Sequence, residues 1–450
     1  MRTRIASLGL CLAVASACAP PERPHIVLFT ADTLRADHLS LFGYPRATSP
    51  RIDAFAADAW NFTQAVTVIP KTGPSFATMF TGRHPQEHGV RSNFAPVPEA
   101  LPVLAERLRD AGYRTAAFVS NPALRESRGF ARGFDTFRRL PEQDGVARVS
   151  RAFFEWADTE WAGGSGAPVF VWIHTIDPHG PYEPPPHHAE PFLADAWAQD
   201  PLRVPGGYAV DEATPNKVLG AVPRYQQRAD GELRVASYVA RYDAEIRYVD
   251  EAFGGVLDRL RADGRLDASA VVFTSDHGES LGEHDYYFEH GWFAYEPGLR
   301  VPLLLKTPGQ REGRRVDAPV SNLDLLPTLL GLAGLACDCE GTDLLRDAAP
   351  GGPVLVESSD AYPEKFHGAR TTAWKYLRRA SDGREELYDL ARDPGETRNL
   401  AGERPEVREE LAGFVSRRLA ALRERALSAA PAPADDPDTL RRLRELGYVE

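Results

Sequence analysis

Two carboxylates and one imidazole follow short apolar runs of the sequence, and together they could hold a metal ion. Asp32 ends the run PHIVLFTAD, and Asp276 and His277 follow the run ASAVVFTS. Oxygen and nitrogen ligands in this mixture favour Zn²⁺ or Mn²⁺, with Ca²⁺ or Mg²⁺ as alternatives. Each residue alone also fits a turn or a helix cap, but the three together predict a metal site.

A threonine in another stretch could act as a nucleophile at that site. The stretch VIPKTGPSFATMFTGRHPQEHGVRSN covers residues 68–93 and contains Thr72 directly after Lys71. Coordination to a metal lowers the pKa of a hydroxyl by many units, so Thr72 is predicted as both a metal ligand and a nucleophile. Lys71 adds positive charge beside it.

Alternating strands and helices must position these residues. Apolar runs at 24–32, 167–179 and 268–279 have the pattern of buried parallel strands, and helical patterns at 101–112 and 248–264 lie between them. This alternation predicts an α/β sandwich around a mostly parallel sheet. Ligands of such sheets bind beyond the carboxyl ends of the strands. The polar residues at the ends of these three runs fall there: Asp32, the group from His174 to His179, and Asp276 with His277.

The remaining segments suggest a catalytic domain at 24–350 and a smaller unit after it. Residues 183–234 are rich in proline, glycine and polar residues, which is typical of an irregular segment that covers a site. A helical pattern at 322–335 closes the larger domain. Short strand patterns and an amphipathic helical pattern at 405–427 predict a small antiparallel α+β subdomain at 351–427. A linker and tail follow at 428–450.

Composition excludes some partners. The chain has 450 residues, 43% of them hydrophobic, and a formal net charge of −12. This is the composition of an ordinary globular protein, and its acidic balance disfavours nonspecific binding of nucleic acid. We therefore expect no nucleic-acid partner.

The first 23 residues have the pattern of an export signal. Arg2 and Arg4 precede an apolar run that is too short to span a bilayer, and small residues follow it. The stretch Ala15-Ser16-Ala17-Cys18 fits an ordinary cleavage site, and it also resembles a bacterial lipobox that lacks the usual leucine. We expect export to the periplasm or the outer surface, with a lipid anchor at Cys18.

Two cysteines lie far from these segments, in the stretch LACDCEG. Cys337 and Cys339 are too few for a structural zinc site. In an exported protein they are expected to form a local disulfide or to stay free, without a catalytic role.

Five stretches, in order along the chain, resemble the sulfatase family of the alkaline phosphatase superfamily. The resemblance covers about Pro24 to Leu419 and implies a large α/β domain with a smaller C-terminal sheet. The stretches are VLFTADTLRADHLSLFGY, TGPSFATMFTGRHPQEHGV, HTIDPHGPYEPP, TSDHGESLGEHDYYFEHGWFAYEPGLRVPLL and ELYDLARDPGETRNLA.

The chain departs from that family at the nucleophile. Sulfatases make formylglycine from Cys or Ser, whereas this chain has Thr72, and Phe76 replaces the arginine that supports formylglycine. The loop also resembles that of nucleotide pyrophosphatase/phosphodiesterases, in which a Lys-Thr pair precedes an Asn that touches a phosphoryl oxygen. That resemblance assigns Thr72 as the nucleophile and Asn93 and Lys71 as substrate ligands.

Two histidines receive roles by resemblance only. His179 in DPHGPY resembles the histidine that protonates the leaving group, and Asp177 beside it could help to hold a second metal. His290 resembles a basic substrate-binding residue or a ligand of a second metal. Each histidine also has an ordinary structural explanation, as part of a turn or as a buried hydrogen-bonded ring.

These observations predict an exported, metal-dependent hydrolase of a small-molecule, glycan or lipid ester. A threonine–sulfate adduct lacks the exit that a formylglycine hemiacetal provides, so a phosphate ester is expected over a sulfate ester. The alternatives are an arylsulfatase-type hydrolase, a phospho-group transferase and a catalytically silent binding protein.

Overall fold

One sheet of eight strands forms the centre of the computed structural model, which describes residues 23–447 except 143–144, 164–165, 209–218, 347–350, 361–364 and 428–434. The strand order is β10-β2-β9-β6-β1-β5-β3-β4. Strand β9 is antiparallel to β2 and β6, and the other neighbours are parallel. The strands are β1 (His25–Ala31), β2 (Trp60–Val66), β3 (Arg114–Val119), β4 (Thr136–Arg139), β5 (Val169–Thr175), β6 (Ser269–Ser275), β9 (Leu303–Lys306) and β10 (Arg314–Ser321).

The central strands are apolar on both sides because helices cover both faces of the sheet. In β1, Ile26 and Leu28 belong to one hydrophobic cluster, whereas Val27 and Phe29 belong to the other. Successive side chains of a strand point to opposite faces, so a strand buried on both sides reads as a continuous apolar run. The predicted α/β sandwich around a mostly parallel sheet is therefore confirmed.

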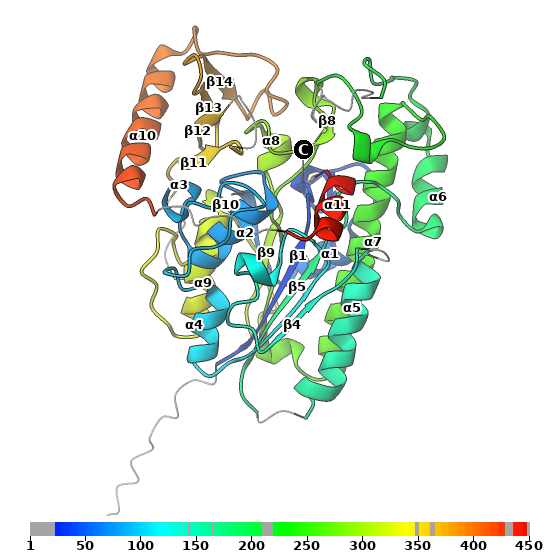
Figure 1. Cartoon of the computed structure of the whole chain (residues 1–450), viewed down its shortest axis with the longest axis vertical. Coiled ribbons are helices and arrows are strands. Elements are labelled where there is room, and N and C mark those ends of the chain that lie inside the picture. The colour runs from blue at the N-terminus through cyan, green and yellow to red at the C-terminus, as the bar shows by residue number, and fades with distance from the viewer. Residues whose placement is uncertain are drawn as a thin grey trace, which may run out of the picture.

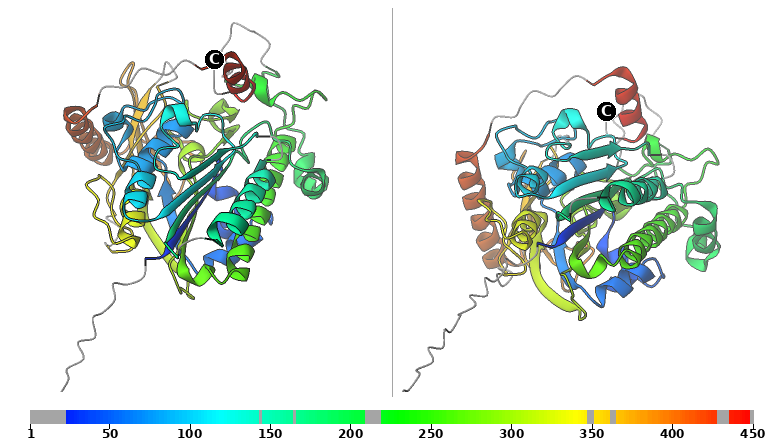
Figure 2. Two further views of the ribbon diagram at one scale, coloured as in Figure 1. Left: turned by 60° about the horizontal axis from the view of Figure 1, so that its bottom comes forward. Right: turned by 90° about the horizontal axis from the view of Figure 1, so that it is seen from below.

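The helices divide between these two faces (Figures 1 and 2). One cluster is completed by α1 (Pro50–Ala56), α5 (Gly145–Trp156) and α7 (Val235–Ala262), and the other by α2 (Thr72–Thr81), α4 (Leu104–Asp110) and α9 (Leu325–Leu332). Helix α7 begins 13 residues before the helical pattern read from the sequence. Three further helices are α3 (Pro85–His88), α6 (Pro186–Ala194) and α8 (Glu296–Leu299).

A separate antiparallel sheet follows the catalytic part, as predicted. Its order is β11-β12-β13-β14, and helix α10 (Pro405–Glu424) packs on it. Strand β12 was not predicted from the sequence, because Gly368 interrupts its pattern of side chains. That glycine is needed, since a Cβ there would lie 2.3 Å from the carbonyl oxygen of Tyr376. The strands are β11 (Val354–Glu357), β12 (Phe366–Arg370), β13 (Trp374–Arg379) and β14 (Glu385–Asp389).

The C-terminal segment packs against the catalytic part, where the sequence suggested only a tail. Helix α11 (Pro437–Glu445) lies at the carboxyl-end side of the sheet, shown in red in Figures 1 and 2. Leu443 and Leu446 pack on Ile176 and Phe94. Asp435, just before the helix, pairs with Arg125 at 2.7 Å and with Arg128.

Three findings concern the expectations about export and cysteines. The lipobox with Cys18 lies outside the described residues. Within them, no helix has both the length and the apolar character to cross a bilayer. Cys337 and Cys339 are joined by a disulfide bond.

Candidate active site

Two aspartates and a histidine converge at the carboxyl ends of neighbouring strands. Asp32 follows β1, and Asp276 and His277 follow β6, which pairs with β1 in parallel. One ligand atom of each residue lies within 4.8 Å of the others, and all three side chains are fully buried. Among the described residues this is the one group of His, Cys, Asp and Glu with such geometry. The predicted metal ligands are therefore brought together.

The ligand atoms are oriented by neighbouring groups that leave them turned toward one another. Nδ1 of His277 donates to the carbonyl oxygen of Gly278 at 2.9 Å, so Nε2 presents a lone pair to the carboxylates. The amide of Asn121 donates to Oδ2 of Asp32. A hydrogen bond from the ring nitrogen that does not face the metal fixes the tautomer and the orientation of a metal-binding histidine.

Thr33, the residue after Asp32, has an unusual backbone conformation beside the candidate metal ligands. Its φ is +56°, an uncommon value for a β-branched residue, and its N–H donates to Oδ1 of Asp276 at 3.3 Å. Such strained residues concentrate at functional sites, where the surrounding structure holds them in place.

The electrostatics of the group fit a divalent cation. Burial raises the pKa of Asp276 to about 7. Burial also holds the pKa of His277 well below its ordinary value, and Lys71 lowers it further. Oδ2 of Asp276 is buried, lies 3.4 Å from Nε2 of His277 and has no hydrogen-bond partner of normal geometry among the described residues. Two buried carboxylates beside a neutral imidazole form a donor set that a cation would satisfy.

Thr72 begins helix α2 and faces the same group. Its hydroxyl donates to Nε2 of His277 at 3.2 Å. Pro74 in the first turn lacks an N–H, which the start of a helix tolerates. The hydroxyl of Ser75 donates to the carbonyl oxygen of Asp276 at 2.7 Å and so ties the start of α2 to the end of β6. Thr72 is thereby held beside the candidate metal ligands.

Asn93 lies across the same helix start, as the sequence predicted. Its Oδ1 accepts from the backbone N–H of Gly73 at 2.7 Å, while Nδ2 is buried and donates to no group of the described chain. The first N–H groups and the dipole of a helix favour a negative charge. Lys71, 2% exposed, adds a cation on the same side. The start of α2 therefore suits an anionic group of a substrate.

His179 and His290 complete the group of predicted residues. The ring of His290 lies 4.4 Å from that of His277 and 5.1 Å from that of His179, measured between centroids. Nδ1 of His290 donates to Oε1 of Glu279 at 3.1 Å. Nδ1 of His179 donates to the carbonyl oxygen of Gly180 at 2.7 Å. Burial lowers the pKa of His179 to about 3, so the free protein holds this ring neutral.

The covering segment contributes to this side of the site. Tyr225 stacks on His179 with 5.9 Å between ring centroids, and its hydroxyl donates to the carbonyl oxygen of Phe288. Asp177, by contrast, accepts from the backbone N–H of Val146 at 2.6 Å and does not join the metal group. The part of Asp177 in a second metal site therefore stays a prediction.

The match to known proteins covers most of the chain. Residues 24–335 match the family model described as Sulfatase. The chain belongs to the sulfatase family. The family makes it a hydrolase of ester bonds. A curated relative, the ulvan-active sulfatase of Formosa agariphila, is 29% identical over 89% of this chain and 82% of its own length.

Solved structures support the fold of this sulfatase-family chain. A protein in complex with its substrate D-glucosamine-2-N,6-O-disulfate superposes with a TM-score of 0.75 at 22% identity, over 90% of this chain and 99% of that one. The phosphonate monoester hydrolase of Agrobacterium radiobacter gives a TM-score of 0.68 at 22% identity, over 90% and 96%. The same fold therefore occurs in proteins named for sulfate and for phosphonate esters.

Sequence reasoning on this sulfatase-family chain missed two residues of the site. Asn121 follows β3 and reaches Asp32, and Glu279 holds His290. Glu279 stands two residues after His277, and the only signal for it was its place in the stretch TSDHGESLGEH. Asn121 carried no signal, because strand order alone places β3 on the far side of β5 from β1.

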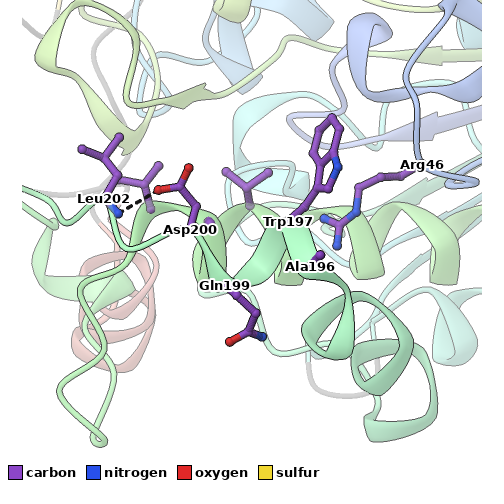
Figure 3. A pocket seen from close by; sticks show the side chains of 9 residues that line it. Arg46, Ala196, Trp197, Gln199, Asp200 and Leu202 are labelled. Atoms are coloured by element: carbon purple, nitrogen blue, oxygen red, sulfur yellow. Dashed lines mark hydrogen bonds between the residues drawn. The ribbon is translucent and has the colours of Figure 1, made fainter.

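A second surface cavity shares none of the predicted site residues. Figure 3 shows Trp197 and Arg46 at one side of it and Leu202 at the other, where the N–H of Leu202 donates to Asp200 at 2.9 Å. Its remaining lining consists of Ala196 and Gln199 and of three apolar residues at the start of α7. The predicted metal ligands of the sulfatase-family chain do not line this cavity.

Proposed function

We propose that this chain hydrolyses an ester through Thr72 and that it prefers a phosphate ester to a sulfate ester. The observation that carries the proposal is the position of the Thr72 hydroxyl, 3.2 Å from Nε2 of His277 at the start of α2. A divalent ion held by Asp32, Asp276, His277 and Thr72, with Zn²⁺ or Mn²⁺ favoured, would lower the pKa of that hydroxyl and neutralise charge on the ester.

The chain's own residues supply the other parts of the reaction. Oγ1 of Thr72 attacks phosphorus in line with the leaving oxygen, forming the Thr72–phosphorus ester as the bond to the leaving group breaks. Nδ2 of Asn93, the ammonium of Lys71 and His290 bind the remaining phosphoryl oxygens. Water then attacks phosphorus and displaces the Thr72 oxygen, which takes up a proton. An acceptor alcohol in place of water would make the enzyme a transferase.

His179 is proposed to protonate the leaving oxygen. In the free protein this ring is neutral and carries its proton on Nδ1, which faces the carbonyl oxygen of Gly180. A bound anion close to the ring would raise its pKa, because an opposite charge favours the protonated form. The proton for the leaving group is therefore taken up at Nε2 when the ester binds.

Two features favour phosphorus over sulfur. Formylglycine cannot be made from threonine, and a threonine–sulfate ester lacks the hemiacetal through which a sulfatase expels sulfate. Phe76, where formylglycine chemistry would need an arginine, is fully buried between Trp172 and His174, with ring centroids 5.0 Å and 4.8 Å away. An arginine would not fit this apolar packing without exposing its charge to an apolar environment.

The preference is tested by matched aryl esters. We expect the purified, metal-loaded protein to show a higher kcat/KM for methyl para-nitrophenyl phosphate or para-nitrophenyl phenylphosphonate than for para-nitrophenyl sulfate. All three release the same phenol, so absorbance compares them directly. Faster turnover of the sulfate would contradict the phosphoester assignment and favour an arylsulfatase-type hydrolase. Absence of turnover of all three would favour a catalytically silent binding protein.

We also propose that the chain is exported and anchored through a lipid at Cys18. The support is the charged and apolar pattern of residues 1–18, which ends in small residues before Cys18. Metabolic labelling with a fatty acid should mark the wild type and not Cys18→Ser, with Cys337→Ser as a matched control that keeps the label. Equal labelling of wild type and Cys18→Ser, or labelling of neither, would contradict the anchor.

A further inference from the structure

A cavity of about 790 Å³ is lined in part by His179, the residue proposed to protonate the leaving oxygen. Its walls come from the segment around His179, the start of α5, the middle of α7 and the C-terminal helix α11. Leu446 of α11 lines the cavity, and Leu443 and Leu446 hold that helix on Ile176. Segments from distant parts of the chain thus enclose one space next to a proposed catalytic residue.

The lining of this cavity is acidic. Five carboxylic acids and two arginines line it. Arg442 is already occupied, because its guanidinium lies 3.0 Å from Glu142 and 2.8 Å from Glu445. An anionic leaving group would therefore meet more carboxylates than available cations.

The innermost acids form a carboxyl pair with no cation among the described residues. Glu245 of α7 is 5% exposed and hydrogen-bonds Asp177. Burial raises the pKa of Glu245 well above its ordinary value, and Asp177 raises it further. Burial also raises the pKa of Asp177. Buried acids are normally paired or neutralised, so a shared proton or a cation would stabilise this pair.

A structural role accounts for the carboxylate of Asp177, but it does not account for Oε2 of Glu245. Oδ2 of Asp177 accepts from the N–H of Val146 in the first turn of α5, and a Cβ on Gly145 would lie 2.3 Å from that oxygen. Asp177 is thereby fixed as a cap of α5. The carboxyl group of Glu245 interacts with Asp177 and with the backbone N–H of Glu183. Its Oε2 is buried and has no hydrogen-bond partner of normal geometry among the described residues, although the residue lines the cavity. That oxygen is available to a ligand.

Part of the cavity lining is aromatic or aliphatic. Tyr248 and four prolines, at positions 181, 184, 185 and 186, line it beside the acids. An aromatic face and aliphatic rings suit the methyl or methylene groups around a nitrogen cation, while the carboxylates suit its charge.

We propose that this cavity binds the leaving group of the ester and that the leaving group is an alcohol carrying a cationic nitrogen, held by Glu245 and Asp177. The proposal rests on the function proposed above, because it needs the ester to lie at Thr72 with its leaving oxygen toward His179. The enzyme would then favour esters with a cationic leaving group over esters with a neutral or anionic one.

The test uses three phenols of similar shape as leaving groups. They carry trimethylammoniomethyl, neopentyl or carboxymethyl groups in the meta position, each as a methyl phosphate diester and as a sulfate. We expect wild-type kcat/KM to be about tenfold higher for the cationic ester than for the neutral one, as about 1.4 kcal/mol of selective binding gives. The anionic ester should be turned over more slowly than the neutral one.

Variants assign the preference to the carboxyl pair. Glu245→Gln should reduce the ratio of cationic to neutral kcat/KM to about twofold or less. Glu251→Gln is the matched control, because Glu251 lies on the same helix, is exposed and contacts His188 instead of the cavity, so the ratio should not change. Should Glu245→Gln fail to fold, Glu183→Gln at the exposed rim should lower the same ratio.

Two kinetic results would overturn the proposal. One is wild-type kcat/KM values for the cationic and neutral esters within about twofold of each other. The other is an unchanged ratio of cationic to neutral kcat/KM in a folded Glu245→Gln protein. Failure of the proposed hydrolysis is distinguishable, because the protein would then turn over none of the para-nitrophenyl esters either. The free phenols, titrated calorimetrically into the metal-loaded protein, measure the charge preference without turnover, and equal affinities would also reject it.

Discussion

Thr72→Ala should lower kcat by several orders of magnitude on every ester that the wild type hydrolyses. The substitution removes the oxygen that forms the covalent intermediate, and no neighbouring side chain is expected to act as the nucleophile in its place. Thr72→Ser should keep part of the activity, because it retains the hydroxyl and loses only the methyl group that restricts its rotamer. Stopped reactions should show added phosphoryl mass on the peptide containing Thr72 in the wild type and none in Thr72→Ala.

Thr78→Ala is the matched control for this result. Thr78 lies on the same helix and is equally buried, but its hydroxyl contacts His88 instead of the metal group. Its loss should change stability more than turnover. Wild-type rates in Thr72→Ala, with Thr78→Ala also active, would rule out the covalent route.

Thr72→Cys separates the two ester chemistries further. Expressed together with a formylglycine-generating enzyme, this variant would gain sulfatase activity if the pocket were otherwise a sulfatase site. We expect no gain, because the buried Phe76 occupies the place of the supporting arginine. A large rise in turnover of para-nitrophenyl sulfate would show that the pocket retains sulfatase chemistry.

Asp276→Asn should remove tightly bound metal and activity together. Asp276 is fully buried, and its Oδ2 lies 3.4 Å from Nε2 of His277, so the amide would replace a charged ligand without changing the shape of the site. Metal analysis of the purified protein should find less than a tenth of wild-type occupancy, because removal of a charged ligand costs metal affinity steeply. Thermal unfolding with and without added Zn²⁺ or Mn²⁺ provides an independent measure, since a bound ligand stabilises the folded state.

Asp267→Asn serves as the comparison. Asp267 lies just before the other end of β6, is exposed and pairs with Arg311 at 2.6 Å. It should bind metal and turn over substrate like the wild type. Full metal occupancy in Asp276→Asn would show that Asp276 is not a ligand, whereas loss of metal in both variants would point to a general effect on folding.

The sequence by itself determined the class of the fold and the end of the sheet that carries the chemistry. Continuous apolar runs such as 24–32 encode strands buried on both faces, because the period of a strand places successive residues on opposite sides. Since β6, β1 and β5 are parallel neighbours, the polar residues that end them must meet. Asp32, Asp276 and His277 could therefore be grouped without a structure.

Only the tertiary structure decided how the remaining parts surround that group. Asn121 reaches Asp32, Glu245 meets Asp177, and α11 packs on Ile176, through contacts between segments far apart in the chain. Local periodicity carries no information about such pairings, because they depend on strand order and on the packing of whole faces. The φ of +56° at Thr33 has the same origin, since the surrounding contacts hold a backbone conformation that threonine alone would avoid.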